Sequence, residues 1–212
     1  MNLFIRAKIN LIVSLIACVG FVTGGLLLTA SADQESKSSS VKRVSKNNVS
    51  DFMLTSHMGT KVSLSDYKGK LVIVLFGYTH CPDVCPTQLS DMQKLLEKLG
   101  DKAKQVQVLF ITFDPERDTP KVLKEFLTFF NPTFVGLTGT KKEIAAVAKQ
   151  YKAQYIKRKS LSRPGYFFGH SSVVYLIDQE GQLFSVYLEL MEDPKFTLDK
   201  MADDIQQLIK KL

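Results

Sequence analysis

The feature that most constrains this fold is a pair of cysteines that directly follows a short, continuously apolar segment. Residues Leu71–Phe76 carry only apolar side chains, which predicts a β-strand buried on both faces. Cys81 and Cys85 follow closely, and the third cysteine of the chain, Cys18, lies in an apolar N-terminal segment. The globular part therefore has one thiol pair, which could form a disulfide, attack a substrate or bind a soft metal ion.

Two prolines place this pair at the start of a helix. Proline is accepted in the first turn of a helix but not in its interior, so Pro82 and Pro86 predict a helix that begins near Cys85 and runs to about Gly100. Side chains four residues apart on a helical turn are about 5–6 Å apart, close to the spacing that a disulfide needs. The helix dipole favours the thiolate, which both nucleophilic attack and metal binding require. A static disulfide is the simpler alternative, but structural bridges usually close longer loops.

The N-terminal segment predicts export from the cytoplasm. Residues 9–30 carry no charge and are long enough to span a bilayer, and Arg6 and Lys8 before them predict that the N-terminus stays in the cytoplasm. We expect a transmembrane anchor over residues 1–30, or alternatively a signal segment cleaved near Ala32. The rest of the chain is then expected on the periplasmic side of a bacterial inner membrane, where conditions are oxidising.

Residues 31–50 are rich in Ser, Lys and Asn, which predicts a flexible polar linker before a domain over residues 51–212. The formal net charge is +7, but the basic residues are scattered and not interleaved with aromatic residues. This distribution argues against a nucleic-acid partner. Small basic clusters occur at residues 157–159 and 141–142. A solvated surface is the simplest interpretation of the positive charge, with weak attraction to anionic lipid or an acidic partner as a secondary one.

The hydrophobic pattern after residue 50 predicts a hairpin followed by alternating strands and helices. It predicts strands over 52–55, 61–64, 71–76, 106–113, 134–137, 173–178 and 183–188, and helices over 86–99, 120–130, 141–151 and 198–212. This order indicates an α/β fold, with a mixed central sheet flanked by helices and an N-terminal β-hairpin extension. Because the thiol pair lies at the first strand-to-helix junction, we expect a thioredoxin-like fold.

Four motifs then occur in order along the chain, at Gly77–Pro86, Asp114–Thr119, Val135–Thr140 and Gly169–Leu176. Together they resemble the Sco/SenC family of copper proteins, which assist assembly of the copper centre of cytochrome c oxidase. The resemblance covers about residues 50–210. It implies that the chain is a copper metallochaperone.

The resemblance also implies the ligands and the partners. In the family the two motif cysteines and one histidine bind a single copper ion, which carries over to Cys81, Cys85 and His170. Soft thiolates select Cu(I), imidazole also suits copper, and an open site of three ligands suits transfer better than structural zinc, which takes four. The oxidation state, Cu(I) or Cu(II), stays open. The implied recipient is the copper-site subunit of cytochrome c oxidase, with another copper chaperone or a thiol reductant as further partners.

Some residues of the motifs are candidates for contacts behind the ligands. His80 neighbours Cys81 and could orient the loop, while Asp114 and Asp118 follow the second buried strand and could support the site or cap a turn. Gly169 stands where the family commonly has an acidic residue, so copper affinity could differ in this chain.

Other functions stay open. The redox-active pair Cys81 and Cys85 could serve a thiol–disulfide oxidoreductase that keeps the recipient's copper-site cysteines reduced. Against this, the spacing is C-x3-C rather than the usual C-x2-C, and His170 would have no role. A redox or copper sensor would use the same site. A peroxidase would need Thr or Ser three residues before Cys85, where this chain has Pro82.

Overall fold

The computed structural model describes residues 41–48, 50–159, 165–188 and 193–210. An eight-stranded mixed sheet, in the order β1-β10-β9-β4-β5-β6-β2-β3, lies at the centre, and β7 and β8 form a separate two-stranded sheet. The strands are β1 (Val41–Asn48), β2 (Met53–Ser56), β3 (Lys61–Ser63), β4 (Leu71–Gly77), β5 (Val106–Thr112), β6 (Val135–Thr138), β7 (Tyr155–Lys159), β8 (Tyr166–His170), β9 (Val174–Ile177) and β10 (Gln182–Tyr187). The helices are α3 (Val84–Leu99), α4 (Pro120–Thr128), α5 (Lys141–Gln150) and α6 (Pro194–Ile209), with short 3-10 helices η1 (Leu64–Tyr67) and η2 (Gly100–Gln105).

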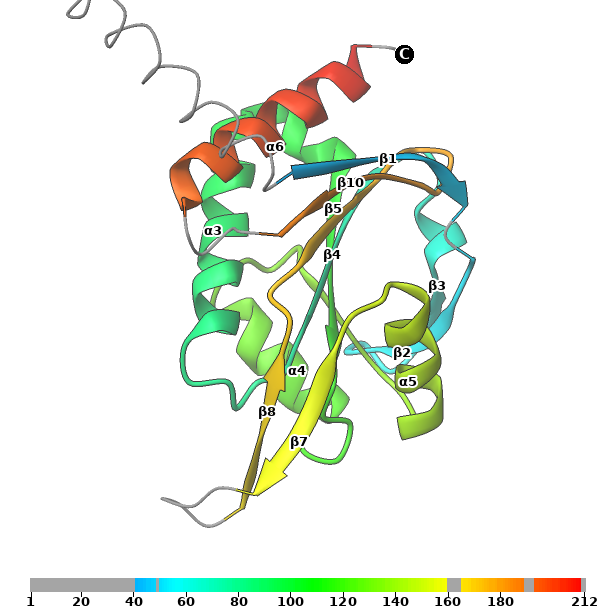
Figure 1. Cartoon of the computed structure of the whole chain (residues 1–212), viewed down its shortest axis with the longest axis vertical. Helices are drawn as coiled ribbons and strands as arrows, with labels where there is room; N and C mark the ends of the chain where they lie inside the picture. The colour runs from blue at the N-terminus through cyan, green and yellow to red at the C-terminus, as the bar shows by residue number, and fades with distance from the viewer. Residues whose placement is uncertain (1–40, 49, 160–164, 189–192, 211–212) are drawn as a thin grey trace, which may run out of the picture. The chain divides into compact units, whose positions relative to one another are not determined.

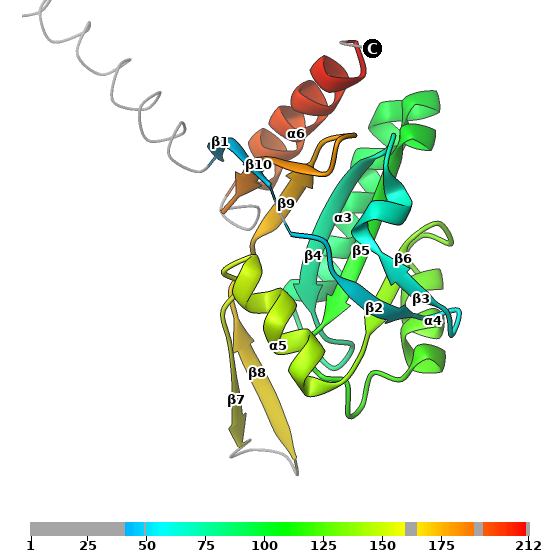
Figure 2. The same ribbon diagram turned by 90° about the vertical axis from the view of Figure 1, so that its right-hand side faces the viewer.

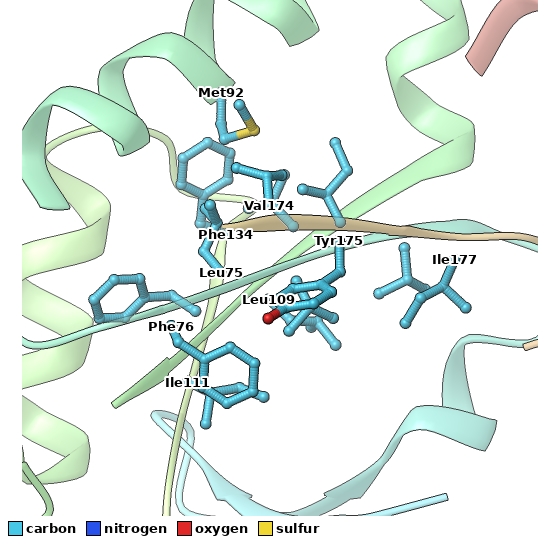
Figure 3. Packing of buried hydrophobic residues seen from close by; sticks show 14 of the residues in the cluster. Leu75, Phe76, Met92, Leu109, Ile111, Phe134, Val174, Tyr175 and Ile177 are labelled. Carbon is cyan, nitrogen blue, oxygen red and sulfur yellow. The ribbon is translucent and has the colours of Figure 1, made fainter. Parts of the chain in front are cut away.

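The core of the domain is built around the neighbouring parallel strands β4 and β5. All residues of both strands are buried, as the continuous apolar run predicted for β4. Figure 1 shows α3 and α4 on one side of the sheet and α5 on the other. Figure 3 shows the resulting two-sided packing, with Met92 and Val174 on one side of the strands and Tyr175 and Ile111 on the other. The mixed sheet with flanking helices is therefore confirmed, as is the hairpin of β2 and β3.

Local sequence signals explain where two of the helices begin. The Thr119 hydroxyl oxygen accepts the backbone N–H of Val122, and Pro120 occupies the first position of α4. At α5, Thr140 and Glu143 form a capping box in which each side chain accepts the other's backbone N–H. Both helices start within the ranges that the sequence predicted.

The largest differences from the sequence prediction are two; in addition, α6 begins at Pro194, before the predicted start at residue 198. Residues 41–48, assigned to the linker over 31–50, form β1, which pairs antiparallel with β10. Their polar composition does not prevent this, because an edge strand needs backbone hydrogen bonds and often carries charged side chains. The β7–β8 hairpin was not predicted either, because most of β7 is exposed and its basic residues give no apolar alternation. In the described residues no helix is long and apolar enough to cross a membrane; the predicted anchor over 1–30 lies outside them.

The sheet topology brings three segments to one edge. In register, Gly77 at the end of β4 pairs with Thr112 at the end of β5, and the Phe113 N–H donates to the Gly77 carbonyl at 2.7 Å. Because β9 runs antiparallel to β4, its first residue, Val174, lies at this same edge, opposite Leu75. The loop before α3, the loop before α4 and the end of the β7–β8 hairpin therefore meet there. Figures 1 and 2 show this hairpin extending beyond the main sheet.

Candidate metal centre

The two thiols lie at the junction of β4 and α3. Cys81 is half-buried in the loop, where its N–H donates to the Tyr78 carbonyl at 3.2 Å. Cys85 is the second residue of α3 and is 1% exposed. Glycine is required beside it, because a Cβ at Gly77 would lie 2.7 Å from the Cys85 sulfur and 2.7 Å from a ring carbon of Phe110. Both cysteines are free thiols.

His170, the last residue of β8, completes the cluster. Its Nε2 lies 3.4 Å from the Cys85 sulfur and 3.9 Å from the Cys81 sulfur. Its Nδ1 lies 3.1 Å from the Ser171 carbonyl oxygen and donates its proton there. This hydrogen bond orients the ring so that Nε2 faces the two cysteine sulfurs.

The three donor atoms have the spacing of a single-ion site. Sγ of Cys81, Sγ of Cys85 and a ring nitrogen of His170 lie within 4.8 Å of one another. Metal–ligand bonds of about 2.0–2.3 Å would put the donors of a trigonal ion roughly 3.5–4 Å apart. Among the described residues no fourth Cys, His, Asp or Glu joins this group. Two sulfurs and one imidazole nitrogen suit copper, and the open coordination argues against structural zinc.

The electrostatics of the two cysteines are opposite. A hydrogen bond from the Cys85 thiol lowers the pKa of Cys81 to about 3, and His170 adds to this although burial opposes it. Donating that hydrogen bond raises the pKa of Cys85, and burial and the Cys81 charge act in the same direction. Burial alone would lower the pKa of His170, but the contacts with Cys81 and the Ser171 carbonyl outweigh it and raise the pKa. The reduced site therefore holds a thiolate at Cys81 and a thiol at Cys85.

Asp118 holds the loop that carries Cys81. Its carboxylate is fully buried and accepts the backbone N–H of Thr79 at 3.0 Å, the Thr79 hydroxyl at 2.6 Å and the Thr112 hydroxyl. His80 lies outside the donor cluster. Its side chain is 54% exposed, and its Nδ1 lies 3.0 Å from the Thr79 hydroxyl and 3.9 Å from Asp118. Asp118 therefore supports the site loop, and His80 borders it.

Aromatic residues surround the His170 ring. The sequence did not predict that any of them positions this ring. Tyr78 meets the imidazole edge-on at 5.9 Å between ring centroids, and Phe113 packs against it at 5.5 Å. The Tyr78 hydroxyl donates to the Phe168 carbonyl and accepts the Phe168 N–H, both at 3.3 Å. Tyr78 thus joins the thiol loop to β8 by hydrogen bonds.

A second set of contacts fixes the outer part of the same hairpin. We call this set the Tyr166 clamp; it is formed by Asp114, Glu116, Arg117, Lys157 and Tyr166. The Tyr166 ring lies between two cations, the Arg117 guanidinium at 3.9 Å and the Lys157 ammonium at 3.5 Å from its centroid. Its hydroxyl donates to Asp114 at 2.8 Å and lies 3.3 Å from Glu116, which also accepts from Lys157 at 2.6 Å. Asp114 also pairs with Arg117. Asp114 therefore acts on the hairpin rather than on the thiols.

Fold and site together define a class of protein: a thioredoxin-like α/β domain in which a C-x3-C pair and a distant histidine form one potential metal site. The SCO1/SenC family profile matches residues 41–210. The chain is 36% identical over 207 residues to an SCO2-like protein of Rickettsia felis, covering 96% of this chain and 95% of that protein. The chain belongs to the SCO1/SenC family.

Solved structures show the same relationship. The structure of Bradyrhizobium japonicum ScoI with copper bound is similar with a TM-score of 0.67 and 36% identity, covering 75% of this chain and 98% of that one. A structure of BsSco, a member of the Sco family of cytochrome c oxidase assembly proteins in which a disulfide switch was identified, is similar with a TM-score of 0.62 and 28% identity, covering 79% and 95%. The thioredoxin-like fold expected from the sequence is confirmed.

Proposed function

We propose that this protein is a copper metallochaperone that binds one copper ion through Cys81, Cys85 and His170 and assists assembly of the copper centre of cytochrome c oxidase. The observation that carries the proposal is the convergence of two sulfurs and one imidazole nitrogen within 4.8 Å at one edge of the sheet. The copper-bound ScoI of Bradyrhizobium japonicum supports it, as does the oxidase-assembly role of the Sco family, to which BsSco belongs. The copper-site subunit of the oxidase is the proposed recipient.

The arrangement favours reversible binding of a soft ion. Cys81 is already a thiolate, whereas Cys85 must lose its proton when the ion binds, so binding should release a proton. The Ser171 carbonyl accepts the Nδ1 proton of His170, so Nε2 is the ring nitrogen that would bind the ion. With three ligands, the ion remains open on one side, so a ligand of the recipient can enter before a ligand of this site leaves.

A second candidate function rests on the asymmetry of the same thiols. Cys81 is half-buried and deprotonated, as an attacking nucleophile requires, whereas Cys85 is buried and protonated. The Cys81 thiolate would attack a disulfide of the recipient and form a mixed disulfide while one recipient thiolate leaves. Cys85 would then lose its proton and displace the second recipient sulfur, leaving a Cys81–Cys85 disulfide and a reduced recipient. The disulfide switch of BsSco favours keeping this candidate.

We also propose that residues 1–30 anchor the domain in a bacterial inner membrane with the site on the periplasmic side, with cleavage near Ala32 as the alternative. The absence of charge from residues 9–30 supports an anchor. Residues 31–40 would remain as the linker, since β1 begins at Val41.

The test is an oxygen-free titration of Cu(I) into the reduced, full-length protein in detergent micelles, against a chromophoric competitor. Tight one-to-one binding that disappears after oxidation of the thiols is the result that the metallochaperone proposal requires. Absent or weak binding would overturn it. Dithiol exchange would then be the leading function, and the reduction potential of the Cys81–Cys85 pair the quantity to measure.

A further inference from the structure

The β7–β8 hairpin has two chemically different faces. Side chains alternate across a strand pair, so one face carries Tyr155, Lys157, Tyr166, Phe168 and His170, all of which contact the body of the domain or the metal centre. The other face carries Ile156, Arg158, Phe167 and Gly169. We call this second set the outer face.

The outer face is apolar and basic at once. Ile156 is 53% exposed and Phe167 is 42% exposed, and both are among the few large apolar side chains exposed in the described chain. Arg158 is the next residue after Ile156 on this face of β7 and lies directly opposite Phe167. Within the described residues no carboxylate pairs with Arg158. A surface of this kind fits a partner that offers an apolar contact bordered by negative charge.

Gly169 adds an independent observation at the end of the outer face nearest the metal centre. Glycine inside a strand costs about 0.5–1 kcal/mol relative to alanine and often marks a close approach of another backbone or ligand. The fold does not require glycine here, because a Cβ would meet only Ile156 Cγ2, at 3.5 Å, an ordinary contact. Its φ also lies outside the left-handed region. The open space therefore faces outward, beside His170.

We propose that the outer face is the docking surface for an acidic partner protein that exchanges copper with the site. This inference rests on the proposed function and adds where the partner binds. An apolar contact at Ile156 and Phe167 orders the complex, Arg158 pairs with a carboxylate of the partner, and Gly169 leaves room for the partner's chain beside His170.

The test measures docking without copper, so that it does not depend on copper transfer. The copper-free, full-length chain and the copper-free copper-site subunit of cytochrome c oxidase, both in detergent micelles, are mixed and their dissociation constant is measured at low and high salt. Arg158→Glu is expected to weaken binding roughly tenfold at low salt, and the difference should shrink at high salt. Phe167→Ser should weaken binding by a similar factor at both salt concentrations.

Lys104→Glu is the matched control. It reverses one charge on η2, which precedes β5 and so lies at the opposite edge of the sheet, and Lys104 is 82% exposed. This variant should bind the subunit as the wild-type chain does. All three variants should keep the wild-type affinity for Cu(I), since none of the changed side chains faces the metal centre.

Two results would overturn the docking surface while leaving the metallochaperone function standing. One is unchanged binding of the subunit by Arg158→Glu and Phe167→Ser at low salt, with normal Cu(I) affinity. The other is that the two variants lose binding to phosphatidylglycerol vesicles but not to the subunit, which would make the outer face a lipid contact. Failure of the wild-type chain to bind Cu(I) would instead sink the proposed function, whatever the docking result.

Discussion

The metal centre joins two regions that are held in different ways. The thiols lie where β4 meets α3, on a strand that is buried throughout and beside a loop fixed by the buried carboxylate of Asp118. His170 lies on a two-stranded hairpin outside the main sheet, connected to the thiol loop through Tyr78 and to the α4 loop through the Tyr166 clamp. The first region depends on the core, and the second depends on a few polar and aromatic contacts at its surface.

This difference indicates that thiol chemistry and metal binding can be separated. We expect the core-supported pair to form a disulfide without help from the hairpin, whereas a three-ligand ion needs both regions in register. Conditions or substitutions that loosen the hairpin should therefore shift the protein from copper binding toward dithiol chemistry. Each of the following predictions breaks or sharpens this division.

The largest effect is expected from Cys85→Ser. It removes one of two sulfurs and the resolving thiol, so Cu(I) affinity should fall by more than the roughly 10–100-fold that loss of an outer contact costs, and no intramolecular disulfide should form. Competitor titration and thiol counting measure the two losses. Cys18→Ser is the control and should change neither, because Cys18 lies outside the site motifs. Retention of tight Cu(I) binding by Cys85→Ser would remove this cysteine from the ligand set.

His170→Ala should affect one activity and spare the other. We expect Cu(I) affinity to fall at least roughly tenfold, while the Cys81–Cys85 disulfide still forms. His80→Ala, which removes the neighbouring exposed imidazole, should leave both properties unchanged. Unchanged Cu(I) and Cu(II) binding by His170→Ala would show that the three-ligand assignment is wrong.

The sequence predicted the first region more completely than the second. The continuous apolar run at Leu71–Phe76 and the flanking prolines located β4, the start of α3 and both thiols, because burial and proline geometry act locally. His170 was placed only by the family resemblance. The strand on which it lies has no apolar alternation with β7 that would reveal a hairpin, and its contacts come from residues more than 40 positions away, such as Arg117 and Tyr78.

The same limit applies to the residues behind the ligands. Asp114 and Asp118 are four residues apart and were assigned the same two alternatives, yet Asp118 holds the thiol loop and Asp114 holds the hairpin. The division follows from tertiary contacts with Thr79 and Tyr166, which spacing alone does not encode. Composition also concealed β1, because its stability comes from backbone pairing with β10.

The pH dependence of the reduced protein should reveal the Cys81 thiolate. Since the pKa of Cys81 is about 3 in the folded state and 9.0 ordinarily, the folded state binds fewer protons between these values, and this group stabilises the fold increasingly as the pH rises. The raised pKa of His170 acts oppositely, but only above its ordinary value of 6.5. The stability of the reduced wild type relative to Cys81→Ser should therefore increase from pH 4 to pH 6.5, as measured by urea unfolding.

Alkylation gives a second check on the same thiolate. At pH 5 iodoacetamide should modify Cys81 and spare Cys85, because the pKa of Cys85 is raised and its side chain is buried. Mass spectrometry of the reduced protein distinguishes the two positions. Equal modification of both cysteines would contradict the assignment of the thiolate to Cys81 and the thiol to Cys85. A stability difference that does not change with pH would contradict it as well.

A smaller effect is expected from loosening the hairpin without touching a ligand. Tyr166→Leu removes the ring between Arg117 and Lys157 and the hydroxyl that donates to Asp114, so Cu(I) affinity should fall about tenfold while Cys81 alkylation is unchanged. Tyr166→Phe keeps the ring, so its Cu(I) affinity should lie between those of the wild type and Tyr166→Leu. A loss of thiol reactivity that parallels the loss of copper affinity would mean that the two regions are not independent.

The smallest effect concerns Gly169, where the family commonly has an acidic residue. Position 169 lies on the outer face, next to Ile156 and directed away from the thiols, so a carboxylate there should not reach the imidazole nitrogens of its neighbour. Gly169→Asp should therefore change Cu(I) affinity by no more than about 0.5 kcal/mol, the usual range for surface substitutions, while weakening binding to an acidic partner. Competitor titration and subunit binding, done on one preparation, separate the two effects. A several-fold gain in Cu(I) affinity would show that the hairpin bends enough to bring this position to the ion. The division between a core-supported thiol pair and a partner-facing hairpin would then fail at position 169, beside His170.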